Sequence, residues 1–227
     1  QYPWHNTGLY GTDCRRPVGQ DMALENMQQV LKACSRAQDL VRQILSFCRQ
    51  NEYEKKSLNL SLVIKEAIKL LRPSLPATIE IKQNIKGENS IIMADVTQMH
   101  QILMNLSTNA AHAMREKGGI LGITLENIEI EQATAKQYEL LSPGHYAKLS
   151  VSDTGHGMDR SVMERIFDPY FTTKKSGEGT GMGLSVVHGI VKSHDGEITV
   201  YSEPGKGTVF HIYLPLIDTY QKEERED

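Results

Sequence analysis

A heptad repeat of apolar residues, in a stretch without glycine or proline, is the feature that most constrains what this chain can fold into. The stretch runs from Asp21 to Gln50, and its seam is formed by Leu24, Met27, Leu31, Cys34, Val41, Leu45 and Cys48. Spacings that alternate between three and four residues predict one long helix. Further apolar residues widen the stripe beyond what a two-stranded coil can cover: Val30, Ala37, Leu40, Ile44 and Phe47. The pattern therefore predicts part of a helical bundle, whose other helices we expect from a second chain or a segment outside this sequence.

After a polar connector over residues 51–57, the apolar pattern changes to a mixture of helical and strand periods. Helices are expected from Ser61 to just before Pro73, from Asp95 (with Gln98 as its capping-box partner) to Gly118, and over 160–166 and 184–193. Strands are expected over 79–82, 91–93, 121–130, 145–152, 197–202 and 208–214. The fold class is therefore α+β, preceded by one long helix.

These patterns divide the chain into four parts. Residues 1–20 are irregular because glycines and prolines interrupt them, 21–57 hold the long helix and its connector, 58–218 form the α+β domain, and 219–227 are a charged tail. The chain does not begin with Met, and we expect it to be part of a longer one.

Composition excludes several classes of protein. The net charge of −3 over 227 residues gives no case for a nucleic-acid partner, which would require a strongly basic face. No apolar run approaches the ~20 residues of a membrane span, and the N-terminus lacks the order of a signal peptide, so we expect a cytoplasmic domain, although the full-length protein could be anchored upstream. Cys14, Cys34 and Cys48 are read as reduced thiols rather than as a disulfide or zinc site.

Four segments carry residues suited to chemistry. On the helix that begins near Asp95, Asn105, Asn109 and His112 share one face, where two amide oxygens could bind Mg²⁺, although an ordinary solvated face would look the same. Next, Asp153 ends an expected strand and is followed by Gly155 and Gly157; this pattern suits a closely approached ligand, or a plain Asp-Gly turn.

The third segment, residues 166–178, begins apolar and ends polar. Phe167 and Phe171 could anchor a loop from which Lys174 or Lys175 reaches a phosphate, although a surface loop with two solvated lysines fits equally well. The fourth segment leads directly into a helix, where unpaired N–H groups favour an anion, and reads Gly179-Thr180-Gly181-Met182-Gly183-Leu184.

In this order, the four segments resemble the ATP-binding domain of sensor histidine kinases, within the superfamily that includes gyrase, Hsp90 and MutL. The resemblance extends over about residues 58–216 and includes the closing run Gly207-Thr208-Val209-Phe210-His211-Ile212-Tyr213-Leu214-Pro215. Residues 35–47 are similar to the second helix of the kinases' dimerisation hairpin. The resemblance implies a two-layer α/β sandwich that holds Mg-ATP under a lid formed by about residues 168–179.

The resemblance also implies roles for individual residues. Asn109 would be the main Mg²⁺ ligand, with Asn105 supporting it or contacting a phosphate, while Asp153 would accept a hydrogen bond from the adenine amino group. The remaining implied nucleotide-binding residues are His112, Gly155, Gly157, Lys174, Gly179, Thr180, Gly181, Gly183, Leu184 and Thr208. Tyr170 and Met182 are expected to pack.

One position discriminates within the superfamily. The members that hydrolyse ATP carry Glu where this chain has Asn105, and an amide has no basic oxygen that could activate water. We therefore expect transfer of the γ-phosphoryl group to a histidine, then to the receiver domain of a response regulator, in a protein that dimerises through residues 21–50.

The acceptor histidine itself is not identified. The family's motif, a His followed by an acid and then Asn-Pro or Asn-Asn, is not found before Asp21, because His5 lacks the acid and Gly8 opposes the required helix. No catalytic residue is therefore assigned. An ATP-gated interaction module without kinase activity remains an alternative, as does a serine kinase or ATPase of the same superfamily.

Overall fold

The computed structural model describes residues 54–87, 89–132, 142–174 and 179–217, together with positions 26, 27 and 30. The expected helix over 21–50, the three cysteines, His5, the charged tail, and lid residues 175–178 lie wholly or almost wholly outside the described residues. The chain divides into two units, Gln1–Asn51 and Glu52–Asp227, and the account below concerns the second.

A five-stranded mixed sheet forms one layer of this domain. Its strands are β2 (Ile79–Ile85), β4 (Gly119–Ile130), β5 (Gly144–Asp153), β7 (Gly207–Pro215) and β6 (Glu197–Glu203), in that spatial order. β2 pairs with β4 in parallel, and the other neighbours are antiparallel. A separate antiparallel pair joins β1 (Lys56–Asn59) to β3 (Ile91–Ala94).

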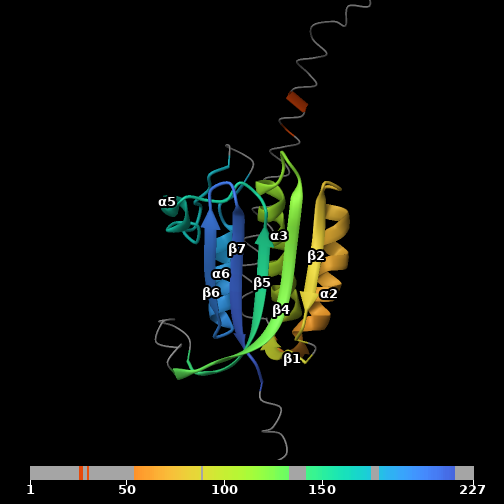
Figure 1. Ribbon diagram of the computed structural model, residues 1–227, viewed down its shortest axis with the longest axis vertical. Coiled ribbons are helices and arrows are strands. Elements are labelled where there is room, and N and C mark those ends of the chain that lie inside the picture. The colour runs from red at the N-terminus through yellow and green to blue at the C-terminus, as the bar shows by residue number, and fades with distance from the viewer. Residues whose placement is uncertain are drawn as a thin grey trace, which may run out of the picture. The chain divides into compact units, whose positions relative to one another are not determined.

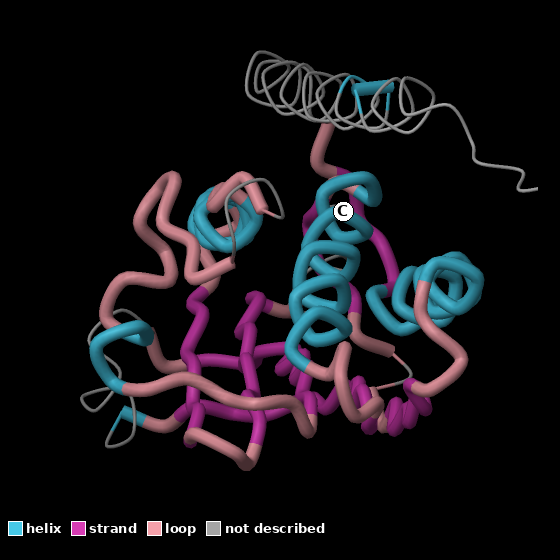
Figure 2. Tube along the Cα trace, turned by 90° about the horizontal axis from the view of Figure 1, so that it is seen from above, coloured by secondary structure: helices cyan, strands magenta, loops and turns pink. Residues whose placement is uncertain are grey.

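Three helices form the second layer, on one side of the sheet (Figures 1 and 2). They are α2 (Leu60–Leu71), α3 (Val96–Ala113) and α6 (Gly183–Ser193), and a single turn, α5 (Arg160–Met163), lies in the connection before α6. A 3-10 turn, η2 (Arg72–Ser74), follows α2. The predicted α/β sandwich is confirmed.

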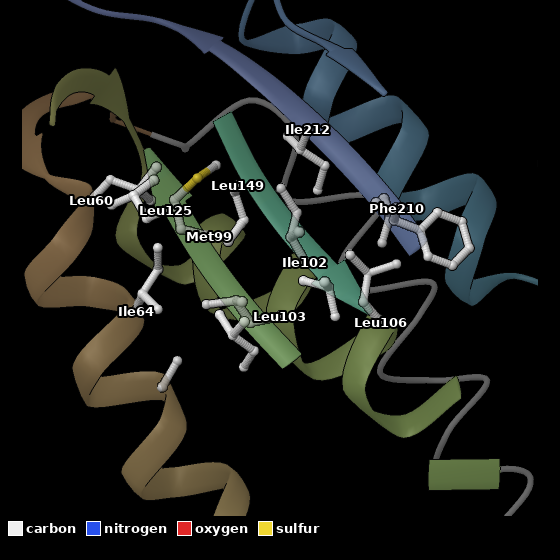
Figure 3. Packing of buried hydrophobic residues seen from close by; sticks show 14 of the residues in the cluster. Leu60, Ile64, Met99, Ile102, Leu103, Leu106, Leu125, Leu149, Phe210 and Ile212 are labelled. Atoms are coloured by element: carbon white, nitrogen blue, oxygen red, sulfur yellow. The ribbon is translucent and has the colours of Figure 1, made fainter. Parts of the chain in front are cut away.

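The core lies between the two layers and is continuous from α2 to β6. Figure 3 shows Ile102, Leu103 and Leu106 of α3 lying among side chains from α2 and from the sheet. All three are at most 1% exposed. Burying such a side chain contributes about 1.5–3 kcal/mol, so α3 is held firmly against the sheet by its apolar face while its other residues remain available for a site.

Some element boundaries differ from those predicted. Strand β1 begins at Lys56, inside the expected polar connector, because residues 56–59 pair with β3 through their backbone. α2 begins at Leu60, since the Asn59 side chain, not that of Ser61, caps it by accepting from the Ser61 N–H at 3.0 Å. α5 ends at Met163 instead of reaching Ile166. The expected cap of α3 is confirmed, because the Asp95 carboxylate accepts from the Gln98 N–H at 3.0 Å.

Candidate functional site

A row of polar side chains closes one end of the core. Asp153 on β5 pairs with Thr208 on β7, and Thr208 pairs with Ser202 on β6. Cross-strand partners lie on the same face of a sheet, and residues two positions along share that face. Val151 and Phe210, two positions along, are buried in the core. The row therefore lies on the helix-facing side of the sheet, at the end where β5 finishes.

The carboxylate of Asp153 is held by backbone groups around it. Its Oδ1 accepts a hydrogen bond of 2.8 Å from the Gly155 N–H. Burial raises the pKa of Asp153 above the usual 3.8, while the backbone N–H groups of Gly155 and Thr208 and the nearby His156 oppose that rise. The row thus presents a partly desolvated acceptor that ionises less readily than an exposed aspartate.

The glycines after Asp153 allow close packing on two sides. A Cβ on Gly155 would lie 2.6 Å from the Cβ of Ala113 at the end of α3, and the His156 N–H donates to the Ala113 carbonyl oxygen at 3.2 Å. Gly157 has φ +66°, and a Cβ there would collide with the carbonyl oxygen of Glu203. The loop after β5 is therefore fixed against both α3 and β6.

Three segments that are distant in sequence meet α3 at three successive turns. Asn105, Asn109 and Ala113 are four residues apart, so they lie on one face of the helix over about 12 Å. At the first turn, a Cβ on Gly183 would lie 3.6 Å from Asn105 Oδ1; at the second, Lys174 Nζ donates to Asn109 Oδ1 at 3.1 Å. At the third lies Gly155. The half-buried His112 is on the same part of the helix.

The glycine-rich segment before α6 is held near the loop that precedes it. Gly181 has φ +70°, and a Cβ there would lie 2.5 Å from the Tyr170 carbonyl oxygen. Gly179 lies beside the Lys174 side chain, and the Thr180 hydroxyl accepts from the Met182 N–H at 3.4 Å. Gly183 begins α6, and the half-buried Leu184 packs against the core. The first N–H groups of α6 thus lie next to Asn105.

Aromatic residues around Asp168 differ in their placement. The Phe167 ring lies 5.2 Å from the His188 ring, and the Arg165 guanidinium lies 4.4 Å from the centre of Phe171. Both phenylalanines are therefore anchored, as predicted. Met182 is buried, also as predicted, but the prediction for Tyr170 was wrong: its side chain is 72% exposed and its backbone has φ +67°.

The structure thus brings the predicted residues together in two groups. The Asp153 group comprises Asp153, Gly155, Gly157 and Thr208, and the Asn109 group comprises Asn105, Asn109, Lys174 and the segment 179–184. The two groups meet through Gly155 and Ala113. The first offers hydrogen-bond acceptors, and the second offers amide oxygens, a cation and helix N–H groups, which suit a metal ion and an anion.

Sequence reasoning missed Ser202. Its Oγ accepts from the Met158 N–H at 2.8 Å, donates toward the Gly207 carbonyl oxygen at 3.0 Å, and lies 2.9 Å from Thr208 Oγ1. The one available signal was its position at the end of the strand expected over 197–202; its place in the row that Asp153 begins follows only from the pairing of β6 with β7.

Within the described part of the chain, no helix is both long enough and apolar enough to cross a membrane.

Comparison with known proteins matches residues 94–218 to the family model described as histidine kinase-, DNA gyrase B-, and HSP90-like ATPase. The sensor kinase CckA of Brucella abortus is 38% identical over 197 residues, which are 87% of this chain and 21% of CckA. The chain thus spans about a fifth of that relative.

Two solved structures of histidine kinases are similar to this chain in fold. The nucleotide-free catalytic domain of the histidine kinase ThkA has a TM-score of 0.58 and 28% identity, covering 72% of this chain and 96% of that domain. ThkA in complex with the response regulator protein TrrA has a TM-score of 0.64 and 25% identity, covering 85% of this chain and 51% of ThkA.

Proposed function

This chain belongs to the family of histidine kinase-, DNA gyrase B- and HSP90-like ATPases, and from that premise we propose that its domain binds Mg-ATP and passes the γ-phosphoryl group to a histidine. The observation that carries the proposal is the meeting of three separate loops along one face of α3, at Asn105, Asn109 and Ala113. An extended ligand with a base at one end and phosphates at the other could reach from the Asp153 group to the Asn109 group.

The Asp153 group is proposed to hold the base. The ionised carboxylate of Asp153 would accept a hydrogen bond from the adenine amino group, and Thr208 would support it from the neighbouring strand. Gly155 and Gly157 let the loop pack closely against α3 and β6, and this packing would fix the backbone beside which the base lies.

The Asn109 group is proposed to hold Mg²⁺ and the phosphates. Mg²⁺ prefers oxygen ligands and keeps several waters and phosphate oxygens, so one or two amide oxygens from Asn109 and Asn105 fit it. Lys174 already lies at Asn109, where its charge could pair with a phosphate, and His112 lies on the same helix. The N–H groups at the start of α6 would face the phosphates, with Gly179, Thr180 and Gly181 shaping the lid.

Transfer, rather than hydrolysis, is favoured by the amide at position 105. Asn105 lacks a basic oxygen with which to remove a proton from water, so the site would position and neutralise the phosphates without activating water. The bond between the γ-phosphorus and its bridging oxygen would break, a bond to an imidazole nitrogen would form, and ADP would leave. The acceptor would be a histidine on a dimerisation hairpin, in a protein that dimerises through residues 21–50.

A response regulator is the proposed next partner. The relative ThkA has been solved in complex with the response regulator TrrA, and its similarity to this chain is the support for the proposal. A receiver domain would take the phosphoryl group from the histidine onto an aspartate.

Calorimetry of ATP binding with and without Mg²⁺ tests the site. We expect micromolar to sub-millimolar binding, which Asp153→Asn weakens and which loses its Mg²⁺ dependence in Asn109→Ala. Asn84→Ala and Asp195→Asn are the matched controls, because both residues are exposed and outside the site. Absence of binding by a folded wild-type chain would overturn the proposal.

A second experiment tests the transfer step. The chain is mixed with labelled ATP and a separately supplied hairpin that carries a histidine acceptor, and acid-labile phosphohistidine is measured. Label on the hairpin supports the kinase. ATP binding without any label on the hairpin would instead favour the ATP-gated interaction module.

A further inference from the structure

We propose that Ser202 is a positioning residue that sets the base selectivity of the nucleotide site by fixing the direction of the Thr208 hydroxyl. The inference rests on the proposed function, and it assigns a role to a residue that belongs to neither the Asp153 group nor the Asn109 group. It follows from counting the hydrogens and lone pairs that meet at one buried oxygen.

Three groups surround the Ser202 oxygen, and two of them have fixed roles. The Met158 N–H, 2.8 Å away, can only donate, and the Gly207 carbonyl oxygen, 3.0 Å away, can only accept. A serine hydroxyl has one hydrogen and two lone pairs. The hydrogen of Ser202 is therefore used on Gly207, and one lone pair is used on Met158.

The third group must then donate. Thr208 Oγ1 lies 2.9 Å from Ser202 Oγ, where only the second lone pair of Ser202 remains. Thr208 thus gives its one hydrogen to Ser202 and offers only lone pairs elsewhere. Ser202 and Thr208 are 5% and 8% exposed, so bulk water competes poorly for these hydrogen bonds.

The consequence appears in the adjacent pair of the row. Asp153 and Thr208 are cross-strand partners, and an ionised carboxylate also has no hydrogen to give. The base therefore meets two acceptors side by side. This pair of acceptors favours a purine that carries an amino group at C6. It disfavours binding of a 6-oxo purine, whose oxygen would face lone pairs.

The experiment compares the Kd values of ATP and inosine triphosphate, which carry an amino group and an oxo group at C6; the 6-oxo base also carries a hydrogen at N1. For the wild-type chain we expect ATP to be preferred by at least about tenfold, the effect of one hydrogen bond of ordinary strength. Ser202→Ala frees the Thr208 hydroxyl to donate to the 6-oxo group, so the preference should fall by about threefold or more. Ser202→Thr keeps the oxygen and should retain most of the preference.

Two further variants separate positioning from general damage. Thr208→Val removes the hydroxyl through which Ser202 acts, so adding Ser202→Ala to it should leave the ATP preference unchanged. Ser150→Ala is the matched control. Ser150 is hydrogen-bonded to His211 and lies on the opposite face of the sheet from Asp153. It should behave as wild type.

Hydrogen exchange of the Met158 amide tests the network without any nucleotide. Exchange should quicken about tenfold or more in Ser202→Ala and stay slow in Ser202→Thr. An unchanged ATP preference in folded Ser202→Ala, or an equal further loss in the Thr208→Val background, overturns the inference. If the wild-type chain binds neither nucleotide while Met158 remains protected, the proposed function itself is wrong and the selectivity claim falls with it.

Discussion

At the scale of the residue, Asp153 is subject to two opposed demands. Burial raises its pKa, whereas hydrogen bonding to a base requires the ionised carboxylate. Because the pKa is raised on folding, the ionised form costs stability in the ligand-free domain: this cost is absent below the unfolded-state pKa and is incurred as pH rises through the folded-state pKa. A bound base would stabilise the ionised carboxylate by a hydrogen bond and so offset part of that cost.

This conflict makes ATP affinity depend on pH. We expect affinity to fall on acidification with a midpoint above 3.8, because the protonated carboxyl is a poorer acceptor. Calorimetry from pH 7 to pH 4.5, with circular dichroism to verify folding, measures this. Asp195→Asn should keep the profile, whereas Asp153→Asn should lose less affinity on acidification, with the remaining loss due to protonation of the ATP phosphates. An equally steep profile in Asp153→Asn would assign the titration to another group.

Lys174 bonds to the oxygen that Mg²⁺ is proposed to use. Lys174→Met keeps an extended side chain but removes the charge, so two changes are expected. ATP affinity in saturating Mg²⁺ should fall about tenfold, since a charge-assisted hydrogen bond contributes about 1.5–3 kcal/mol. The Mg²⁺ concentration for half-maximal ATP binding should also fall, because Asn109 Oδ1 no longer has a competing donor.

Titration of Mg²⁺ at fixed ATP measures both effects. Lys82→Met is the control, as Lys82 is an exposed lysine on β2 outside both groups. An unchanged Mg²⁺ requirement in Lys174→Met would mean that the bond to Asn109 does not compete with the metal.

The residues of the site could be predicted from the sequence only where they form an uncommon local pattern of residue types. Alternating glycines and paired asparagines stand out in a chain, and the structure brings them together. Ser202 did not stand out, because a single serine is common and its role depends on hydrogen bonds from two other segments. Tyr170 was wrongly predicted to pack: its side chain is exposed and its φ is positive, and neither property can be recognised from the residue type.

At the scale of the element, the spacing of apolar residues predicted which helices and strands exist better than it predicted where they begin and end. The helices at α2, α3 and α6 follow from their stripes, which the core confirms. Strand β1 was missed because Lys56 and Ser57 are polar, and their pairing with β3 depends on backbone groups that any residue supplies. Asn59 takes the place of Ser61 as the cap, since both residue types are favoured at this position and either could begin the helix.

Two glycines offer a matched test of how elements are packed. Gly155→Ala would put a methyl group 2.6 Å from Ala113 and separate the β5 loop from α3, so we expect a stability loss of about 1–3 kcal/mol and a large loss of ATP affinity. Gly189→Ala, in the middle of α6, meets nothing within 4 Å and should stabilise the domain by about 0.5–1 kcal/mol.

Denaturant unfolding and calorimetry measure both variants. ATP affinity should be unchanged in Gly189→Ala. Normal stability and affinity in Gly155→Ala would show that the loop can move away from α3 at no cost to the site.

At the scale of the whole molecule, the sequence predicted two layers but not their topology. Alternation marks a strand, yet it contains no information about which strand lies beside it. The parallel pairing of β2 with β4, reached through β3 and α3, therefore had to come from the structure. Long-range pairings are set by how all apolar faces are buried at once.

The stability of the domain should depend on His194, which lies buried just after α6. Burial lowers its pKa, opposed by the Ile190 carbonyl and assisted by Lys55, and its Nδ1 lies 2.8 Å from that carbonyl oxygen. The contribution of His194 to the free energy of unfolding is thus fully present above pH 6.5. It is lost as pH falls below that value, with a slope of at most about 1.4 kcal/mol per pH unit.

Denaturant unfolding between pH 7 and pH 5 checks this expectation. His194→Gln cannot take up that proton, so the loss on acidification should be smaller than in the wild type. Some loss should remain, because burial and Lys148 also lower the pKa of His211. The exposed His145→Gln should follow the wild type; equal slopes in all three proteins would exclude His194 as the cause.

The placement of three loops along successive turns of α3 also determines where insertions and deletions are tolerated. One residue inserted between Asn105 and Asn109 would turn everything beyond it by about 100° and move it by about 1.5 Å. Asn105 would keep its neighbour Gly183, while Asn109 would leave Lys174 and Ala113 would leave Gly155. Among homologous chains, length variation should therefore accumulate in the connections and be nearly absent from this helix.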